Sequence, residues 1–177
     1  LHDALPISLI GEIRQAFEQA GNDAAVRCIV LAAEGKAFCA GADLNWMRRM
    51  ADYNRQQNID DAGELARMLH TIFACPKPTI ARVQGDVYAG GMGLVAACDM
   101  AVAAADVKIG FPEAQRGLLP ALITDVLRGK VRAGDLAELF LVGHAIEAER
   151  AREIGLVQRV VPAHRLMDEA LSLAEVV

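Results

Sequence analysis

Residues 35–44 read GKAFCAGADL, and only Glu34 separates them from the apolar run VRCIVLAA at 26–33. The run is nearly continuous in β-prone residues, which predicts a strand that is covered on both faces. The segment after it consists mostly of small residues. Small side chains let another molecule approach the backbone closely, and glycine permits dihedral angles that are closed to other residues. We therefore expect a ligand to contact the main chain here.

A second stretch of the chain repeats this arrangement. TIARVQG (79–85) predicts another buried strand, and DVYAGGMG (86–93) follows it. If Gly90 and Gly91 open a helix, their N–H groups have no intrahelical acceptor and point outward with the positive end of the helix dipole. Two such loops side by side would aim N–H donors at one acceptor oxygen, as in an oxyanion hole. The same glycines would equally serve tight turns and close helix packing, and their spacing does not distinguish the two interpretations.

The apolar period switches repeatedly between a helical and an extended pattern along the rest of the chain, which predicts a single α/β domain. A helix is expected over 8–21, with Ser8 as its N-cap and Gly21 as its end. The other expected helices cover 45–74, 90–99, 121–130, 134–143, 147–155 and 163–177. The other expected strands cover 100–104, 107–111 and 156–161.

Composition excludes several classes of protein. The 177 residues are 54% hydrophobic but only 5% aromatic, so aliphatic side chains build the core. A net charge of −5 argues against nucleic acid as a partner. The longest apolar stretch, 94–105, is interrupted by Asp99 and is too short to span a membrane. The four cysteines form no C-x-x-C pair and the histidines are scattered, which predicts reduced buried thiols, a cytoplasmic location and no metal site.

The two ends of the sequence differ from the rest. Residues 1–7, LHDALPI, read as a non-native segment, so residues 8–177 are taken as the domain. The end, LSLAEVV, lies in the middle of an amphipathic helix with no capping signal. We therefore expect a fragment of a longer domain.

Three blocks of the chain together resemble the enoyl-CoA hydratase/isomerase (crotonase) superfamily in their order and spacing. They are KAFCAGADL (36–44), PKPTIARVQGDVYAGGMGLVAACDMAVA (76–103) and FPEAQRGLLPA (111–121). The resemblance implies a ClpP/crotonase-like α/β fold, a spiral of ββα units with two roughly perpendicular sheets, here truncated at both ends. It also implies an acyl-CoA thioester as substrate, no cofactor apart from the CoA of the substrate, and a homotrimer or hexamer.

The resemblance also assigns roles to individual residues. The oxyanion-hole amides fall on Ala42 and Gly90, and a catalytic carboxylate falls on Glu113, directly after Pro112. Further contacts with the substrate or its CoA fall on Ala40, Asp43, Leu44 and Gly91. Asp43 would equally serve as the N-cap of the helix that follows it.

The family often carries a second carboxylate, but the matching position here is Gly93. Glu113 would then catalyse hydration alone, with water held by the backbone or by a carboxylate of the substrate. It would alternatively move a proton between two carbons, as an isomerase does, or Asp61 or Glu64 would supply the second carboxylate. GADLNWM (41–47) is similar to a bacterial subgroup that includes hydratases of branched glutaconyl-CoA thioesters and shares this glycine, which favours hydration. A non-catalytic acyl-CoA-binding protein is the remaining alternative.

Three other features have competing interpretations. Lys108, Arg128, Lys130 and Arg132 would either meet the phosphates of CoA or form a solvated helix end, and we favour the second. Trp46, with Met47, would either shape an acyl pocket or belong to the core. Cys39 has no histidine near it in sequence, so we interpret it as a buried structural thiol.

Overall fold

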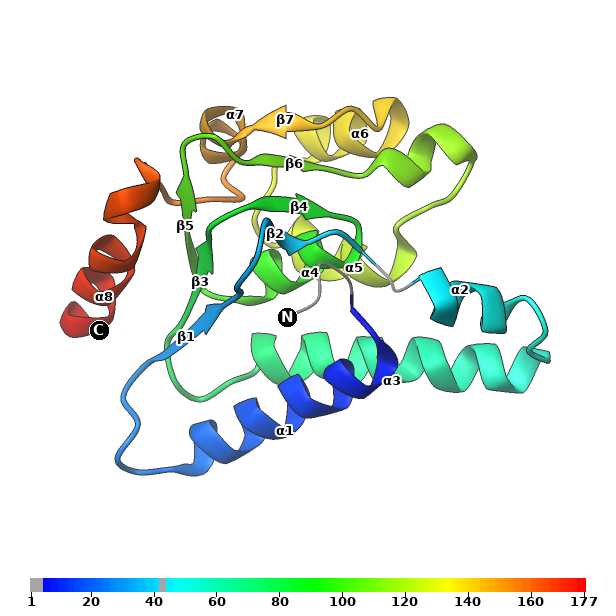
Figure 1. Ribbon diagram of the computed structural model, residues 1–177, viewed down its shortest axis with the longest axis horizontal. Helices are drawn as coiled ribbons and strands as arrows, with labels where there is room; N and C mark the ends of the chain where they lie inside the picture. The colour runs from blue at the N-terminus through cyan, green and yellow to red at the C-terminus, as the bar shows by residue number, and fades with distance from the viewer. Residues whose placement is uncertain (1–4, 42–43) are drawn as a thin grey trace.

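The computed structural model describes residues 5–41 and 44–177. Within them the strands form two four-stranded sheets (Figure 1). The first is parallel throughout, with the order β1 (Ile29–Ala32), β3 (Thr79–Val83), β5 (Met100–Ala104) and β8 (Arg159–Val161). The second has the order β2 (Ala37–Cys39), β4 (Asp86–Tyr88), β6 (Lys108–Gly110) and β7 (Ile146–Glu147), in which β7 alone is antiparallel.

From β1 to β6, successive strands of the chain alternate between the two sheets, because β1, β3 and β5 of the first sheet each lead through a corner into a strand of the second; β7 then adds to the second sheet and β8 returns to the first. These corners pack against one another closely. A Cβ at Gly85, between β3 and β4, would lie 2.1 Å from the carbonyl oxygen of Lys36, between β1 and β2. Only glycine allows this approach of two backbones. The stacked corners bring β2 and β4 side by side, so the segments that follow these two strands leave the second sheet together.

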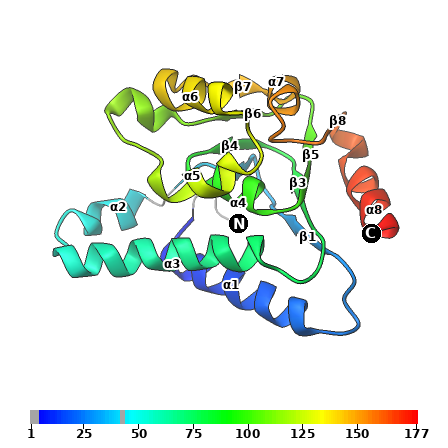
Figure 2. The same ribbon diagram turned by 180° about the vertical axis from the view of Figure 1, so that it is seen from behind.

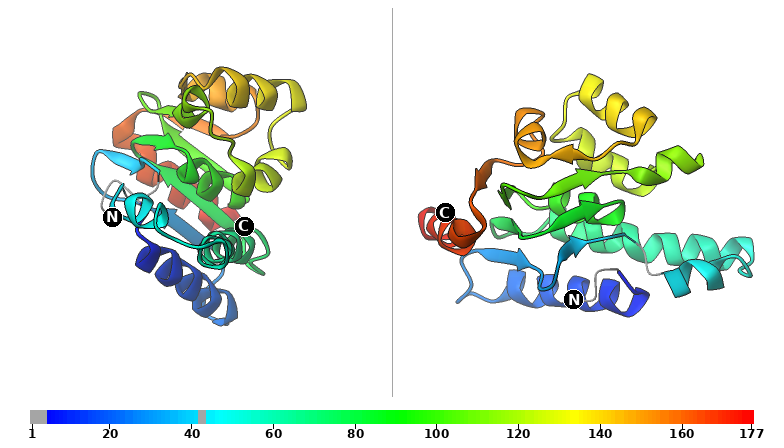
Figure 3. Two further views of the ribbon diagram at one scale, coloured as in Figure 1. Left: turned by 90° about the vertical axis from the view of Figure 1, so that its right-hand side faces the viewer. Right: turned by 45° about the horizontal axis from the view of Figure 1, so that its top comes forward.

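The helices cover the sheets on several sides (Figures 1 and 2). Long helices α1 (Ile7–Asn22) and α3 (Arg55–Phe73) pack against each other, and α3 also contacts α4 (Gly90–Ala97) and α5 (Ala121–Arg128). Helix α8 (Leu166–Val176) packs on β1, β3 and β5, at the other end of the molecule from α2 (Leu44–Met50) (Figure 3). The remaining elements are η1 (Pro112–Arg116), α6 (Ala133–Val142), α7 (Ala148–Glu153) and η2 (Ala163–Arg165).

Helix α4 is the centre of the core. Residues 91–97 of this helix are all buried, since the helix is apolar on every side and has no face for solvent. Its first residue, Gly90, is only partly buried, so the buried part of the helix begins at Gly91. The end of the segment 1–7 also packs here, because Leu5 is 3% exposed and its N–H donates to the carbonyl oxygen of Gly41 over 2.8 Å. The foreign origin of that segment stays a prediction.

Several local predictions were wrong. Helix α1 begins at Ile7 with Pro6 as its N-cap, so Ser8 lies inside the first turn. The helix expected over 45–74 is two helices, because Asn54 starts α3 with a capping box: its side chain accepts from the N–H of Gln57, whose side chain accepts from the N–H of Asn54. The segments expected as loops after the first two buried strands contain β2 and β4, and β7 was not predicted at all.

No helix among the described residues is both long enough and apolar enough to cross a bilayer.

Candidate active site

The N-terminus of α4 follows a strained turn. Ala89, the residue before the helix, has a φ of 50° and a ψ of −117°, which is unfavourable for any residue with a Cβ. Such strain costs on the order of 1–3 kcal/mol and persists only where the surrounding structure imposes it. The turn makes Gly90 the first residue of α4, so its N–H has no acceptor within the helix and lies at the positive end of the helix dipole.

The segment after β2 meets this turn. Gly41 has a φ of +103°, a conformation that glycine adopts without strain. A Cβ at Gly41 would lie 3.2 Å from the Cβ of Ala89 and 3.6 Å from Oε1 of Glu113. Three segments that are far apart in the sequence therefore converge: the segment after β2, the start of α4, and η1.

Glu113 lies in η1, directly after Pro112, and is half-buried. Its Oε2 is buried and has no hydrogen-bond partner among the described residues. Leaving a carboxylate oxygen unpaired in the interior is costly, so native proteins rarely do so without a function for the group. The arrangement leaves Glu113 free to bond to a molecule that enters the site.

Glu113 and Gly90 line one pocket of about 280 Å³. Its described lining residues are Leu5, Ile10, Trp46, Met50, Leu65, Ala89, Gly90, Phe111, Glu113, Leu118 and Leu119. Glu113 is the only ionisable side chain in this set. A smaller hollow of about 190 Å³ shares Leu65, Gly90, Phe111 and Leu119 with the pocket and continues along α5 to Ile123. The site is thus an apolar cleft with one carboxylate and the N-terminus of α4 in its wall.

The predicted substrate contacts have different positions. Leu44 opens α2, while Ala42 and Asp43 lie outside the described residues. Ala40 is exposed at the end of β2 and is not among the described pocket residues. Gly91 packs on β2, since a Cβ there would lie 2.7 Å from the Cβ of Cys39. The roles of these residues toward a ligand, and the pairing of the Ala42 and Gly90 amides, stay predictions.

Gly93 lies where three helices meet. A Cβ at this position would lie 2.6 Å from Cγ2 of Ile123 on α5 and 3.3 Å from Cδ1 of Leu69 on α3. Both neighbours are buried, at 3% and 2% exposure. The glycine therefore permits the close packing of α4 against α5, and an apolar side chain occupies the space that a side chain at position 93 would need.

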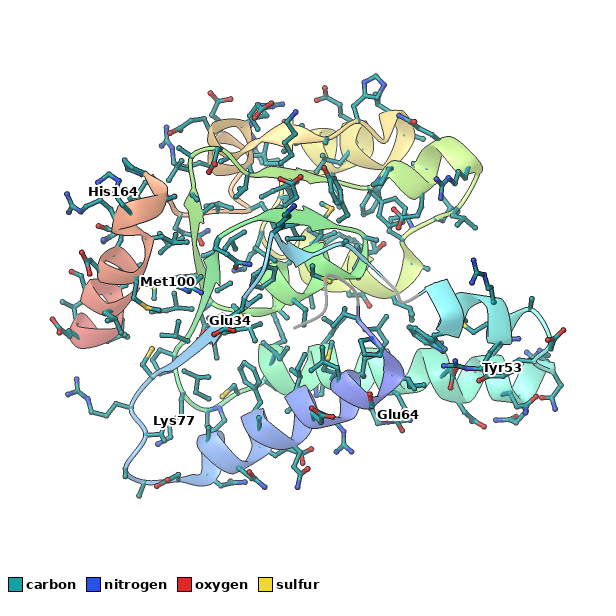
Figure 4. All side chains as sticks on the ribbon, in the orientation of Figure 1. Glu34, Tyr53, Glu64, Lys77, Met100 and His164 are labelled. Carbon is teal, nitrogen blue, oxygen red and sulfur yellow. The ribbon has the colours of Figure 1, made fainter. Side chains whose placement is uncertain are left out.

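Neither alternative carboxylate is among the described pocket residues. The Oδ2 of Asp61 accepts a hydrogen bond of 2.7 Å from Nε1 of Trp46. Glu64 lies on α3 (Figure 4) and pairs with Arg67 at 2.8 Å; the hydrogen bond from Arg67 lowers the pKa of the Glu64 carboxyl. Both groups thus have partners in the protein, and the described part of the chain brings only Glu113 into the pocket.

The other features singled out from the sequence have structural roles. Burial raises the pKa of the Cys39 thiol to about 11, so it is protonated at neutral pH and a poor nucleophile. Two of the four basic residues have partners within the protein: Nζ of Lys130 donates to the carbonyl oxygens of Cys98 and Asp99 just after α4, and Arg132 pairs with Asp135. Trp46 is both buried and part of the pocket wall, so its two interpretations are not exclusive.

Sequence reasoning missed most of the pocket wall. Leu65, Phe111, Leu118 and Leu119 were not predicted as site residues. The signal available for Leu118 and Leu119 was a pair of large apolar side chains between Gly117 and Pro120, in a segment expected to be a loop; in the structure they are 48% and 78% exposed.

Comparison with known proteins decides the family. The family model described as "Enoyl-CoA hydratase/isomerase" matches residues 1–177. The chain belongs to the enoyl-CoA hydratase/isomerase family. A relative from Thermus thermophilus is 37% identical over 161 residues, which are 91% of this chain and 64% of the relative. The enoyl-CoA isomerase/hydratase fer4 of Mycosarcoma maydis is 34% identical over 151 residues, covering 84% of this chain and 54% of that protein.

Solved structures confirm the crotonase fold of this family member. A crystal structure of an enoyl-CoA hydratase from Shewanella pealeana superposes with a TM-score of 0.94 at 31% identity, covering 99% of this chain and 65% of that one. An enoyl-CoA hydratase from Bacillus anthracis gives a TM-score of 0.88 at 33% identity, covering 97% and 66%. The chain therefore spans about two thirds of the length of these relatives, and it carries the part of the fold that holds Gly90 and Glu113.

Proposed function

We propose that this chain carries the reaction centre of an enoyl-CoA hydratase, a lyase that adds water across the α,β double bond of an acyl-CoA thioester. The observation that carries the proposal is the unpaired, buried carboxylate oxygen of Glu113 in the same apolar pocket as the N-terminus of α4. The apolar wall of the pocket suits an acyl chain. The N–H at the start of α4 suits a thioester carbonyl that becomes enolate-like during the reaction.

The thioester oxygen would accept a hydrogen bond from the N–H of Gly90 and a second from the N–H of Ala42, the partner that the family resemblance assigns. Negative charge grows on this oxygen as the double bond is attacked. A single donor of this type contributes roughly 2.7–4 kcal/mol to the stability of the transition state. The dipole of α4 adds to it, because Gly90 is the first residue of that helix.

Glu113 would carry out both proton transfers of the reaction. Its carboxylate accepts a proton from the water molecule whose oxygen bonds to the β-carbon, and the electron pair of the double bond moves toward the thioester oxygen. The protonated Glu113 then delivers a proton to the α-carbon, which completes the addition of one water and restores the carboxylate. General acid–base catalysis of this kind contributes typically 10²–10⁴-fold to a rate, as an order of magnitude.

Isomerisation of a 3-enoyl thioester is the second candidate. The packing of Ile123 at Gly93 favours it, since one carboxylate suffices to move a proton between two carbons of the same chain, whereas hydration also needs a positioned water. The name of the Mycosarcoma maydis relative includes both activities.

The residues of the pocket wall also indicate whether the acyl group is charged. Because Glu113 is the only ionisable side chain among the described lining residues, a second carboxylate on the acyl chain would be buried without a cation near it. We therefore propose an uncharged acyl chain rather than a glutaconyl-type one. Assembly as a homotrimer or hexamer, a cytoplasmic location and the lack of a separate cofactor enter the proposal from the sequence and the family resemblance alone.

The test is an absorbance assay of thioester conjugation with wild-type protein, Glu113→Gln, and Glu12→Gln as a matched control on the exposed face of α1. Loss of conjugation from a 2-enoyl-CoA indicates hydration, and gain of conjugation from a 3-enoyl-CoA indicates isomerisation. Glu113→Gln should lower either rate by about 10²-fold or more, and Glu12→Gln should leave it unchanged. A Glu113→Gln variant that turns over at the wild-type rate contradicts the proposal.

A further inference from the structure

Trp46 is a buried part of the pocket wall. It is 5% exposed, lies on the short helix α2, and lines the pocket together with Met50 of the same helix and Leu65 of α3. It is also the only tryptophan of the 177 residues. A tryptophan is the largest side chain a protein can place in such a wall, so its orientation decides how much room remains for a ligand.

The indole is held from the neighbouring helix. Its Nε1–H donates to Oδ2 of Asp61 on α3 over 2.7 Å. A buried indole N–H needs an acceptor, and a carboxylate makes the stronger, charge-assisted kind of hydrogen bond. Asp61 precedes Leu65 by one helical turn, so the acceptor and the apolar wall residue share one face of α3.

The hydrogen bond of Asp61 reaches another helix, unlike those of the acidic residues near it. Asp60, one residue earlier, is exposed and accepts a hydrogen bond from the side chain of Gln56 over 2.8 Å. Glu64 pairs with Arg67 on the same helix. Both of these contacts stay within α3, whereas the contact of Asp61 joins α3 to α2.

We propose that Trp46 is a specificity-determining residue of the acyl pocket and that Asp61 is the positioning residue that holds its indole ring in the pocket wall. The ligand class is the uncharged acyl chain of a CoA thioester, so the inference rests on the proposed function. Removal of the acceptor takes away the hydrogen bond that joins the indole ring to α3, so this contact no longer fixes the orientation of the ring. The wall then loses its shape for the acyl chain, while the contacts of the CoA portion are unaffected.

The single tryptophan makes the test direct. Its fluorescence reports the pocket wall of the intact chain, and octanoyl-CoA, a saturated thioester that undergoes neither reaction, serves as the probe, with free CoA as the reference ligand. The variants are Asp61→Leu, which removes the acceptor, and Asp61→Asn, which keeps one. Asp60→Leu is the matched control on the exposed face of the same helix.

We expect octanoyl-CoA, but not free CoA, to change the emission of the wild-type protein. Asp61→Leu should shift the emission to longer wavelength and weaken octanoyl-CoA binding roughly tenfold, with free CoA affected less than about twofold. Asp61→Asn should restore most of the affinity, and Asp60→Leu should behave as wild type. A purely structural role of Asp61 would weaken both ligands equally and would not be rescued by Asn.

Two outcomes overturn the inference: octanoyl-CoA fails to change the wild-type emission, or Asp61→Leu binds octanoyl-CoA as tightly as Asp60→Leu does. If Asp61→Leu does not fold, Trp46→Phe decides, because it removes the N–H donor while keeping an aromatic ring; calorimetry should then show the same selective loss of octanoyl-CoA affinity. A wild-type protein that binds octanoyl-CoA but turns over no enoyl thioester would contradict the proposed reaction and leave the acyl site in place.

Discussion

Gly93 offers a quantitative test of why this chain lacks a second carboxylate. The packing of α4 against α5 predicts that position 93 cannot accept a side chain unless Ile123 is made smaller. Glu at position 93 would restore the family's frequent residue, yet its Cβ alone would lie 2.6 Å from Cγ2 of Ile123. We expect Gly93→Glu to destabilise the protein rather than to create a better hydratase.

The change in the free energy of unfolding is worked out for the simplest substitution, Gly93→Ala. Helix propensity favours alanine over glycine by about 1 kcal/mol. Overpacking costs about 1–3 kcal/mol, and Ile123 cannot yield easily because a β-branched side chain on a packed helix has little rotamer freedom. The net effect is a loss of up to about 2 kcal/mol in the free energy of unfolding, from the same two terms. Glutamate adds the cost of burying a charged carboxylate, several kcal/mol more.

A double-mutant cycle measures this coupling. Ile123→Ala alone should cost about 2–5 kcal/mol, because it leaves a cavity. In that background Gly93→Ala should become neutral or stabilising by up to about 1 kcal/mol, since the clash with Cγ2 is gone and helix propensity remains. The coupling between the two positions should therefore be about 1–3 kcal/mol.

Urea denaturation followed by circular dichroism gives the four free energies of unfolding, with unchanged m-values as the condition for comparing them. Gly11→Ala is the control, because this glycine lies inside α1 and its would-be Cβ has no atom within 4 Å apart from its chain neighbours and the backbone of its own helix, so alanine should stabilise the protein there. Strict additivity of the costs at positions 93 and 123 would refute the packing argument.

Three further predictions follow from other contacts. Gly91→Ala should destabilise the protein by about 1–3 kcal/mol and abolish turnover, measured by denaturation and by the conjugation assay, because its Cβ would lie 2.9 Å from the carbonyl oxygen of Cys39. Cys39 should react with iodoacetamide at pH 7 at least about 10²-fold more slowly than it does in urea, as burial raises its pKa to about 11; equal rates would contradict its burial. The pKa of Asp135 is lowered, first by the hydrogen bond from Arg132 and then by Arg150, so its pairing stabilises the fold above about pH 4 and is lost as the pH falls through the lower folded-state pKa. Asp135→Asn should accordingly flatten the acid side of a stability-against-pH profile, and an unchanged profile would count against this pair.

Much of the fold was predictable from local sequence. The apolar runs that form β1, β3 and β5 extend over at least four residues each, and α4 is uniformly apolar. Runs of this length are enough to predict a buried strand or helix from the sequence pattern. Of the second sheet, only β6 was predicted, because it lies inside the strand expected over 107–111. The strands β2 and β4 have three residues each and β7 has two, which is too short to show a period, and they exist because their backbones pair with neighbouring strands.

The sequence by itself determined which groups the candidate site can use: glycines at the start of an apolar helix, and Glu113 after a proline, which the family resemblance singled out. These are local facts, because the dihedral freedom of glycine and the chemistry of a carboxylate belong to the residues themselves. Only the tertiary structure decided what surrounds them. The contact of Trp46 with Asp61, the packing of Ile123 on Gly93 and the unpaired oxygen of Glu113 each depend on side chains from separate elements meeting in space, and one strand or helix carries no record of its neighbours.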